Sequence, residues 1–326
     1  MIGDRPFVNC PNLILYCRKA QLSEGFASNF GGKELVYLDG SPPQAAAAPV
    51  VLPADTIVFS SPEMHKIVCA ELGLAPDTVL TKTQCDSITS LQVCGNAVGR
   101  KFNAYINDGR IVRIVPVAGS GEQMATVTRG SLDSLADLPL LRNLSTLIIP
   151  YQSIFDLTPL ANSKIEKLDL SVNMLDDLAP LASMRFLKDL TINHSQQNSL
   201  APLNRSRALS RLNFSGICQS QFDELCAAEN GSLTLLLVSS SDKLCNIDRI
   251  GNLINLDSLF IGDTNVTDIT PALSLKYLRR FGIRNLQIPD LDVIRSFEHL
   301  TALSTDKKQE EKIAALYGGT FPFKAY

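Results

Sequence analysis

Side chains suited to acid–base or nucleophilic chemistry are few in this chain. It holds three histidines, His65, His194 and His299, and only His194 is followed by a nucleophile, Ser195. A hydrolytic site would also need an acid that orients the histidine and donors for an oxyanion, and no motif supplies them. We therefore expect no enzymatic activity.

The eight cysteines are the other residues that could hold a metal ion or react. They include no C-x-x-C pair and no cluster with histidine at zinc-ligand spacing. Most lie at small apolar positions, as Cys69 does in the middle of an amphipathic segment. We interpret the cysteines as reduced thiols of the core, and we expect no metal and no other cofactor.

Net charge and hydropathy argue against nucleic-acid binding and against a transmembrane helix. The 326 residues carry a net charge of −3 with a pI near 5.7, which is not the basic balance of a nucleic-acid-binding protein. No apolar run approaches the roughly 18 residues that a transmembrane helix needs. The segment from Met1 to Ala20 lacks the basic start, apolar centre and small-residue cleavage site of a signal peptide. Taken alone, this indicates the cytoplasm, unless the chain is a mature or excised piece.

A repeat organises the elements that would position any site. The segments LSTLIIPYQSIFDLTPLA, from Leu144, and IEKLDLSVNMLDDLAPLA, from Ile165, are two consecutive copies of one pattern, and further copies follow. The reference apolar residues of the copies are Leu147, Leu168, Leu190, Leu212, Leu236, Leu259, Phe281 and Leu303. A period of about 22 residues with an L-x-x-L-x-L core is that of a leucine-rich repeat.

The spacing within each copy predicts a short strand followed by a tight helical turn. Apolar residues nearly alternate around Leu147, which fits a strand with one buried side. Ile154, Leu157 and Leu160 then recur every three positions, which fits a 3₁₀ helix. One coil cannot bury its own apolar side, whereas stacked coils bury a continuous core. The expected fold is an α/β right-handed solenoid with one curved parallel sheet.

Aspartates and prolines mark the point where each coil turns. A carboxylate nine residues past the reference can cap backbone N–H groups, and a proline follows three residues later. The aspartates are Asp156, Asp177, Asp268 and Asp290, and the prolines are Pro159, Pro180, Pro202 and Pro271. This D-x-x-P-L signature resembles the 22-residue class of bacterial leucine-rich repeats to which the internalins belong. The family's asparagine, five residues past the reference, is present only as Asn173.

Two stretches depart from the regular repeat. After Leu212, the segment SGICQSQFDELCAAENG is irregular and predicts a true helical turn near Phe222 to Ala227. Near the start, Leu91 matches the reference residue, but the distance from it to Leu147 is more than twice the period. The excess contains KFNAYINDGRIVRIVPV, two alternating runs around Asn107-Asp108-Gly109. This predicts an inserted β-hairpin over residues 98–118, followed by a loop.

Both ends of the array carry segments that could cover its exposed core. We expect Ser61 to cap an amphipathic helix that ends at Gly73, and a second, shorter helix to start from Thr81. These segments resemble the helical N-terminal cap of secreted internalin-like arrays. At the other end, a helix capped by Thr305 or Asp306 and ended by Gly318 is expected to cap the last coil.

The first residues follow a different pattern. The segments from Cys10 to Tyr16 and from Leu35 to Leu38 resemble the two strands of the closing unit of BspA-type surface repeats. The Pro- and Ala-rich run SPPQAAAAP indicates a linker. The predicted organisation is a BspA-like unit over 1–40, a linker over 41–54, a helical cap with the first repeat strand over 55–97, the inserted hairpin and loop over 98–131, the solenoid over 132–305, and a capping helix with a tail over 306–326.

The candidate site lies on the concave face, where residues one before, one after and three after each reference point away from the core. On the coils of Leu168, Leu190 and Leu212 these positions hold side chains of both charges. On the coils of Leu236 and Leu259 they include apolar side chains, where polar ones are expected. The predicted binding residues are Lys167, Asp169, Asp189, Arg211, Leu235, Leu237, Phe260, Arg280 and Arg284. An exposed apolar group with a polar rim is typical of a site for a protein partner. Alternatively, the hairpin or a loop shields the leucines.

We hypothesise a non-catalytic scaffold that recognises a protein or a glycan through this face. The internalin-like and BspA-like patterns imply an extracellular or cell-surface setting. The alternative is a sensor or regulatory domain of a larger signalling protein, or a cytoplasmic adaptor, which fits the lack of a signal-peptide pattern.

Overall fold

The computed structural model describes residues 14–17, 34–37, 55–97, 102–107, 111–116, 125–195, 199–227 and 230–324. The chain divides into two compact units, Met1–Ala54 and Asp55–Tyr326. In the first unit, β1 (Ile14–Cys17) and β2 (Glu34–Tyr37) pair in parallel. The resemblance of this unit to BspA-type repeats stays a prediction.

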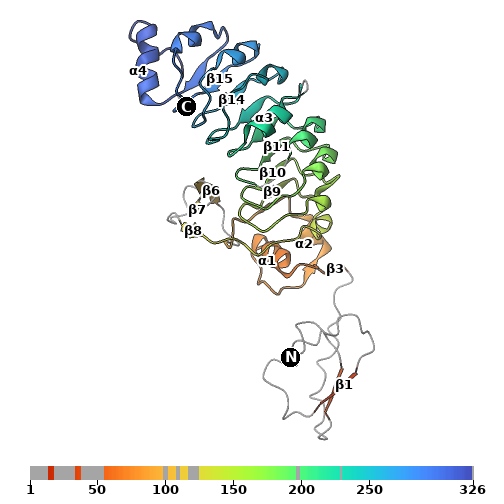
Figure 1. The fold of residues 1–326 in the computed structure, drawn as a ribbon. Coiled ribbons are helices and arrows are strands. Elements are labelled where there is room, and N and C mark those ends of the chain that lie inside the picture. The colour runs from red at the N-terminus through yellow and green to blue at the C-terminus, as the bar shows by residue number, and fades with distance from the viewer. Residues whose placement is uncertain are drawn as a thin grey trace. The chain divides into compact units, whose positions relative to one another are not determined.

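The second unit is built on one parallel sheet of nine short strands (Figure 1). The reference residues pair with one another from strand to strand, from Leu91 with Leu147 through to Phe281 with Leu303. This register confirms the predicted α/β solenoid. The strands are β5 (Ser90–Gln92), β9 (Thr146–Ile148), β10 (Lys167–Asp169), β11 (Asp189–Thr191), β12 (Arg211–Asn213), β13 (Leu235–Leu237), β14 (Ser258–Phe260), β15 (Arg280–Gly282) and β16 (Ala302–Ser304).

Short 3₁₀ helices run along the outer side of the coils, while the strands line the inner side of the curve (Figure 1). Each predicted aspartate caps the turn that leads into such a helix. Asp156 accepts the N–H of Thr158 at 2.8 Å, and Asp177, Asp268 and Asp290 do the same two residues ahead. The helices are η3 (Leu138–Leu140), η4 (Thr158–Leu160), η5 (Ala179–Ser183), η6 (Ala201–Arg205), η7 (Ile250–Asn252), η8 (Thr270–Ser274) and η9 (Leu291–Ser296).

Different polar residues occupy the slot that the family fills with asparagine. Buried Asn173 donates to three backbone carbonyls and accepts one backbone N–H. In the coil of β9, Gln152 donates to the carbonyl of Gly95 at 2.7 Å. In the coil of β13, the hydroxyl of Ser241 accepts the N–H of Gly216 at 2.9 Å. In these three coils, backbone groups inside the turns are thus satisfied without a continuous asparagine ladder.

The coil after β12 departs from the pattern, as its sequence indicated. There α3 (Gln219–Leu225) replaces the 3₁₀ helix, and it buries Phe222 and Leu225 in the core. The step from Leu212 to Leu236 is the longest between reference residues from β9 to β16, and this α-helix takes up the extra length.

The N-terminal cap begins with α1 (Pro62–Glu71), which Ser61 caps by accepting the N–H of Met64. Asp137, which lies before η3, joins this helix to the array: its carboxylate accepts the N–H and hydroxyl of Ser60 and the N–H of Ser61. Before and after the helix, β3 (Thr56–Ile57) and β4 (Leu80–Thr81) pair with each other in antiparallel fashion.

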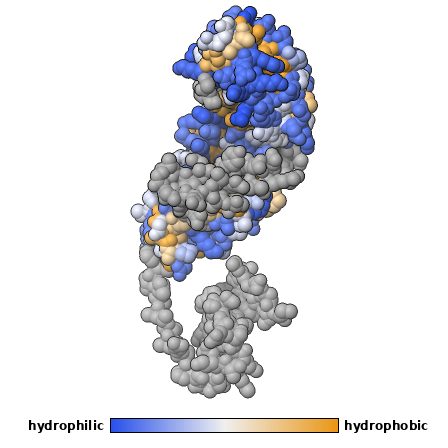
Figure 2. Space-filling view, turned by 90° about the vertical axis from the view of Figure 1, so that its left-hand side faces the viewer, coloured by the Kyte–Doolittle hydropathy of each residue, from blue (hydrophilic) through white to orange (hydrophobic). Residues whose placement is uncertain are grey.

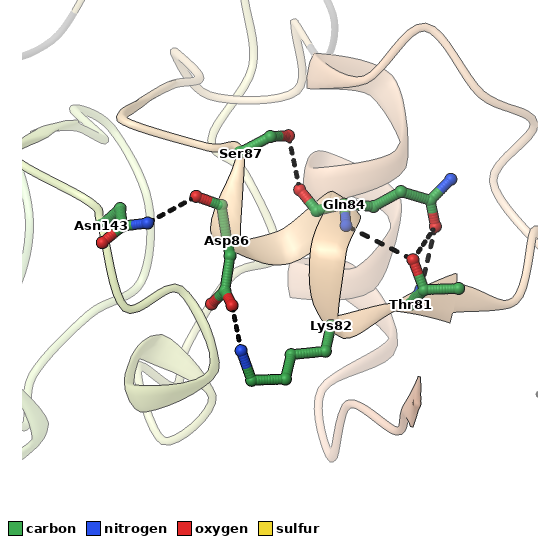
Figure 3. Close-up of polar contacts among 6 residues, drawn as sticks. All are labelled: Thr81, Lys82, Gln84, Asp86, Ser87 and Asn143. Atoms are coloured by element: carbon green, nitrogen blue, oxygen red, sulfur yellow. Dashed lines mark hydrogen bonds and ion pairs between the residues drawn. The ribbon is translucent and has the colours of Figure 1, made fainter. Parts of the chain in front are cut away.

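The second cap helix, α2 (Lys82–Asp86), starts at Thr81 as expected. Thr81 and Gln84 form a reciprocal capping box (Figure 3). At the far end of α2, the Asn143 side chain donates to the main-chain carbonyl of Asp86 at 2.7 Å, and the Asp86 carboxylate pairs with Lys82. The hydrogen bond from Asn143 attaches the cap to the coil of β9.

The inserted hairpin is present, with β6 (Phe102–Asn107) antiparallel to β7 (Ile111–Pro116). A third strand, β8 (Ala125–Val127), follows the predicted loop and pairs with β7. The Gly- and Ser-rich segment before β8 lies outside the described residues.

At the C-terminal end, α4 (Lys307–Leu316) begins at Asp306 with a capping box to Gln309. Gln309 is buried, and its amide donates to the carbonyls of Ile283 and Leu286 at 3.0 Å. The helix therefore covers the last turns and satisfies their backbone groups. In the part of the chain that the structure describes, no helix is both long enough and apolar enough to span a membrane.

Candidate binding surface

The parallel register arranges outward side chains in rows across the sheet. We call the side on which they lie the sheet face. The first row, one residue before each reference, runs Lys167, Asp189, Arg211, Leu235, Ser258, Arg280. The second row, one residue after each reference, runs Asp169, Thr191, Asn213, Leu237, Phe260, Gly282. Neighbours within a row are one strand spacing apart, about 4.8 Å between backbones.

The N-terminal half of the sheet face is charged. The Arg211 Nε lies 3.6 Å from the Asp189 carboxylate; the Arg211 side chain is exposed, whereas Asp189 is partly buried. The Asp169 carboxylate accepts the N–H and the hydroxyl of Ser171 at 2.9 and 2.6 Å. Desolvation raises the pKa of Asp169 above its usual value, although these hydrogen bonds and the charge of Lys167 oppose the shift.

The apolar half centres on Phe260, which is half-buried. Its place in the repeat predicted a freely exposed ring, but the ring lies over Gly282 on the next strand. Leu237, on β13, is its neighbour on the other side in the second row. Leu235 lies two residues earlier on the same strand, in the first row. Both leucines are half-buried. The three side chains thus form one apolar cluster on the sheet face.

The arginines around this cluster are spread more widely than the sequence suggested. Arg280, on the strand next to Phe260, donates to the Asp257 carboxylate at 3.1 Å. Arg284 is exposed just beyond the end of that strand. Arg211 lies three strands from Arg280 in the same row, about 14 Å away by strand spacing, on the charged side of the cluster.

Asp257 is the residue that reasoning from sequence missed. It lies two residues before its reference, a position that the frame does not assign to the sheet face. Its carboxylate nevertheless holds Arg280 and also accepts from the hydroxyl of Ser258. The sequence did contain a signal for this contact. An acidic residue stands directly before a strand, and an arginine begins the strand of the next coil.

Figure 2 views the molecule from the side on which the strands lie in Figure 1. Hydrophilic residues cover most of the C-terminal coils in this view, and hydrophobic residues lie among them. The sheet face therefore combines polar rows with a limited apolar area.

His65, His194 and Ser195 each lie against backbone atoms. Nε2 of His65 lies 2.9 Å from the carbonyl of Thr78. His194 has a left-handed backbone with φ of 51° and lies against Gly216, while the Ser195 hydroxyl donates to the Leu170 carbonyl at 3.2 Å. Because that hydroxyl is directed to a backbone carbonyl, it is not positioned as a nucleophile for His194.

Among the residues that the structure describes, no group of three His, Cys, Asp or Glu side chains could hold a metal ion. Six of the described cysteines are free thiols, and four of these are buried. Burial raises the pKa of Cys94 and of Cys226 to about 12, which suits side chains that act as small apolar groups. Cys10 lies outside the described residues, and of Cys17 only the backbone is described.

Fold and surface together define a leucine-rich repeat solenoid. No family model and no curated protein matches the sequence. Among solved structures, internalin C2 from Listeria monocytogenes is similar, with 20% identity and a TM-score of 0.54, over 78% of this chain and 99% of the internalin. A second internalin from the same organism has 19% identity and a TM-score of 0.41, over 82% and 88% of the two chains. The Arabidopsis receptor kinase HAESA, solved with a peptide hormone and a co-receptor, has 17% identity and a TM-score of 0.40, over 55% and 33%.

Proposed function

We propose that this chain is a non-catalytic scaffold that binds a protein partner on the sheet face between β10 and β15. One observation carries the proposal: Leu235, Leu237 and Phe260 form an apolar cluster on a face where the neighbouring strands carry polar side chains. Leucine and phenylalanine at outward positions leave apolar surface in contact with water, which is unfavourable. A partner that covers them would recover that free energy, at about 25 cal/mol per Å² of apolar surface.

The surroundings of the cluster suit a protein interface. The strands of the sheet are fixed by backbone pairing on both sides, so that little conformational entropy is lost when a partner docks. An aromatic side chain at the centre with arginine–carboxylate pairs at the rim is the usual composition of an interface hot spot. The pairs here are Arg211 with Asp189 and Arg280 with Asp257.

A protein fits this cluster better than a glycan does. Sugar hydroxyls need hydrogen-bonding groups at the centre of the site, and the side chains of Leu235 and Leu237 offer none. A hydrophobic side chain of a protein partner would instead pack against Leu235, Leu237 and Phe260. Binding to glycans but not to proteins is the result that would redirect the proposal.

The test is a quantitative pull-down with the purified chain and extracts of the source organism. Phe260→Ala removes the centre of the cluster, and Tyr277→Ala is the matched control, because Tyr277 is a 56% exposed aromatic residue in the turn before β15 and not on the sheet face. The proposal requires a captured protein that Phe260→Ala loses and Tyr277→Ala retains. Capture that both variants retain would place the partner elsewhere, for example on the inserted hairpin.

We infer an extracellular or cell-surface setting, which rests on the likeness of the repeat pattern to the internalins. The free cysteines argue for the opposite setting, since thiols persist most readily in a reducing compartment. Fractionation of the source cells, with protease treatment of intact cells, distinguishes the two. Protection of the chain from external protease would favour the cytoplasmic adaptor.

A further inference from the structure

At or shortly after the end of each of these 3₁₀ helices, one residue donates its N–H to the carbonyl three residues earlier. In five coils this residue is apolar: Leu141, Met184, Leu253, Leu275 and Phe297. In the coil that leads to β10, the same hydrogen bond, 3.0 Å long to the Leu160 carbonyl, belongs to Ser163. Serine is a smaller side chain than the leucine, methionine or phenylalanine found at this position in those coils.

One other coil has serine at this position, but its surroundings differ. Ser206 makes the same backbone hydrogen bond, to the Leu203 carbonyl, in the coil that leads to β12. There α3 packs against η6, and Asn204 donates to the Glu224 carbonyl at 2.8 Å. Ser206 is buried there, with only 3% of its surface exposed. A helix of that kind is absent from the regular turn beside Ser163.

The repeat that holds Ser163 is short. The step from Leu147 to Leu168 is the shortest between reference residues from β9 to β16, and six residues separate the end of η4 from the start of β10. A pocket of about 360 Å³ lies between the coils of β9 and β10. This volume lies in the range of small-molecule sites. Its apolar lining includes the core residues Leu138, Leu141, Leu144 and Ile165.

Three polar side chains complete the pocket. The Ser163 hydroxyl is buried and has no hydrogen-bond partner in the described part of the chain. Arg142 and Lys164 line the pocket, both are exposed, and neither forms an ion pair with a described acidic residue. The acidic residue attached to this coil, Asp86, is already paired with Lys82 (Figure 3).

We propose that this pocket binds a small amphipathic carboxylate of the medium-chain fatty-acid class. The apolar chain of the ligand lies on Leu141, Leu144 and Ile165, where it takes the place of the missing leucine or methionine. Its carboxylate lies between Arg142 and Lys164 and accepts a hydrogen bond from the Ser163 hydroxyl, which satisfies that buried donor. One ligand thus meets the apolar, the cationic and the unpaired polar feature together.

A second hollow in the array serves as an internal comparison. It lies between the coils of β15 and β16 and has a similar volume, about 350 Å³. There Phe297 holds the position of Ser163, and the lining includes Glu298 as well as Lys276. The acidic side chain and the aromatic ring make it unsuitable for the same ligand. The pocket beside Ser163 is therefore distinguished by its residues and not by its size.

Isothermal titration calorimetry with octanoate tests the proposal, with octan-1-ol as the uncharged control. The wild-type chain should give saturable one-to-one binding of octanoate and much weaker binding of octanol. Ser163→Met fills the pocket with the side chain found at the same place in the next coil, and it should abolish octanoate binding while the chain stays folded. Should that variant fail to fold, Ser163→Val reduces the volume more gently and should weaken binding.

The charged rim is tested separately. The double variant Arg142→Gln/Lys164→Gln should weaken octanoate binding about tenfold, equivalent to about 1.4 kcal/mol, and leave octanol unchanged. Lys276→Gln, at the place of Arg142 in the comparison hollow, should change neither. A short peptide that ends in leucine with a free carboxylate, titrated in parallel, distinguishes a free fatty acid from a chain terminus as the source of the same chemistry.

Two results would overturn the proposal. One is the absence of saturable octanoate binding to the wild-type chain below the micelle concentration. The other is octanoate binding that Ser163→Met leaves unchanged, which would place the ligand elsewhere on the molecule. Equal affinity for octanol and octanoate would contradict the carboxylate class.

Discussion

The aromatic ring of Phe260 lies over the backbone of Gly282 on the adjacent strand. A Cβ at position 282 would lie 3.2 Å from Cγ of Phe260 and 3.3 Å from its Cα, and it would come closer still to Cδ1 of the ring. The backbone of Gly282 is ordinary strand, so glycine is needed here for space and not for a special conformation. The pair explains why a phenylalanine on an outward position is only half-exposed.

This contact predicts strong coupling between the two positions. Gly282→Ala should destabilise the wild-type chain, because its methyl group displaces the ring of Phe260. In the Phe260→Ala background, where no ring is present, the same change should cost much less. We expect a coupling free energy of roughly 0.5–3 kcal/mol from a double-mutant cycle measured by urea unfolding.

Gly251→Ala is a suitable control for that cycle. A Cβ at position 251 would meet the hydroxyl of Ser274 and not the ring of Phe260. Its cost should therefore be the same with and without Phe260→Ala. Additive effects of Gly282→Ala and Phe260→Ala would show that the ring does not depend on the glycine.

The reference leucines should carry the stability of the solenoid. Leu168 is 1% exposed at the centre of β10, and Leu168→Ala should cost about 2–5 kcal/mol in the free energy of unfolding, by loss of apolar burial and formation of a cavity. Lys167→Ala, one residue earlier on the exposed side, should stay within about 0.5 kcal/mol. Urea denaturation of both variants checks the expectation, and similar values for the two would contradict the repeat frame.

The raised pKa of Asp169 gives stability a definite dependence on pH. Because the folded state favours the protonated carboxyl, the stabilising contribution of this group is present below the unfolded pKa, about 3.9, and is lost as pH rises through the folded pKa. Asp169→Asn keeps an oxygen that accepts from Ser171 but removes the charge. Relative to wild type, this variant should be more stable at neutral pH than at acidic pH.

The pKa of Asp156 shifts in the opposite direction, so its contribution to stability should have the opposite dependence on pH. Hydrogen bonds from the side chain and backbone of Thr158 lower its pKa. Its contribution is therefore present above the unfolded pKa and is lost as pH falls through the folded pKa. Asp156→Asn should lose stability relative to wild type at neutral pH and approach wild type in acid. The same pH trend for Asp156→Asn and Asp169→Asn would contradict the assignment for Asp169.

The described cysteines should divide into two classes of reactivity. Cys245 is exposed, and Cys218 is half-buried at the N-terminus of α3, where desolvation opposes but hydrogen bonds from Ser220 and backbone N–H groups lower its pKa. Both should react with iodoacetamide in the folded protein. Cys94 and Cys226 should react only after unfolding, because burial raises the pKa of each to about 12. Mass spectrometry of labelled peptides reads the classes, and rapid native labelling of Cys94 would contradict its burial.

The repeat period and the identity of its apolar residues were enough to determine the solenoid. Each coil has a buried side that it cannot cover alone, so any chain with this spacing must stack, and Leu147 through Leu303 then fall into register. Asp156 and its equivalents were predictable in the same way, because a carboxylate two residues before an N–H caps it through local geometry. Both are short-range consequences of the order of residues.

The features of the two candidate sites needed the tertiary structure, because they arise between coils. Gly282 shapes the surroundings of Phe260 from the next coil, and nothing local to either residue reveals the contact. In the sequence, Ser163 is an ordinary turn residue. Its hydrogen bond to the Leu160 carbonyl shows that it corresponds to Met184, and the pocket that it lines forms only where adjacent coils stack. Sequence sets what each coil must bury, whereas the packing of one coil on the next decides what remains open.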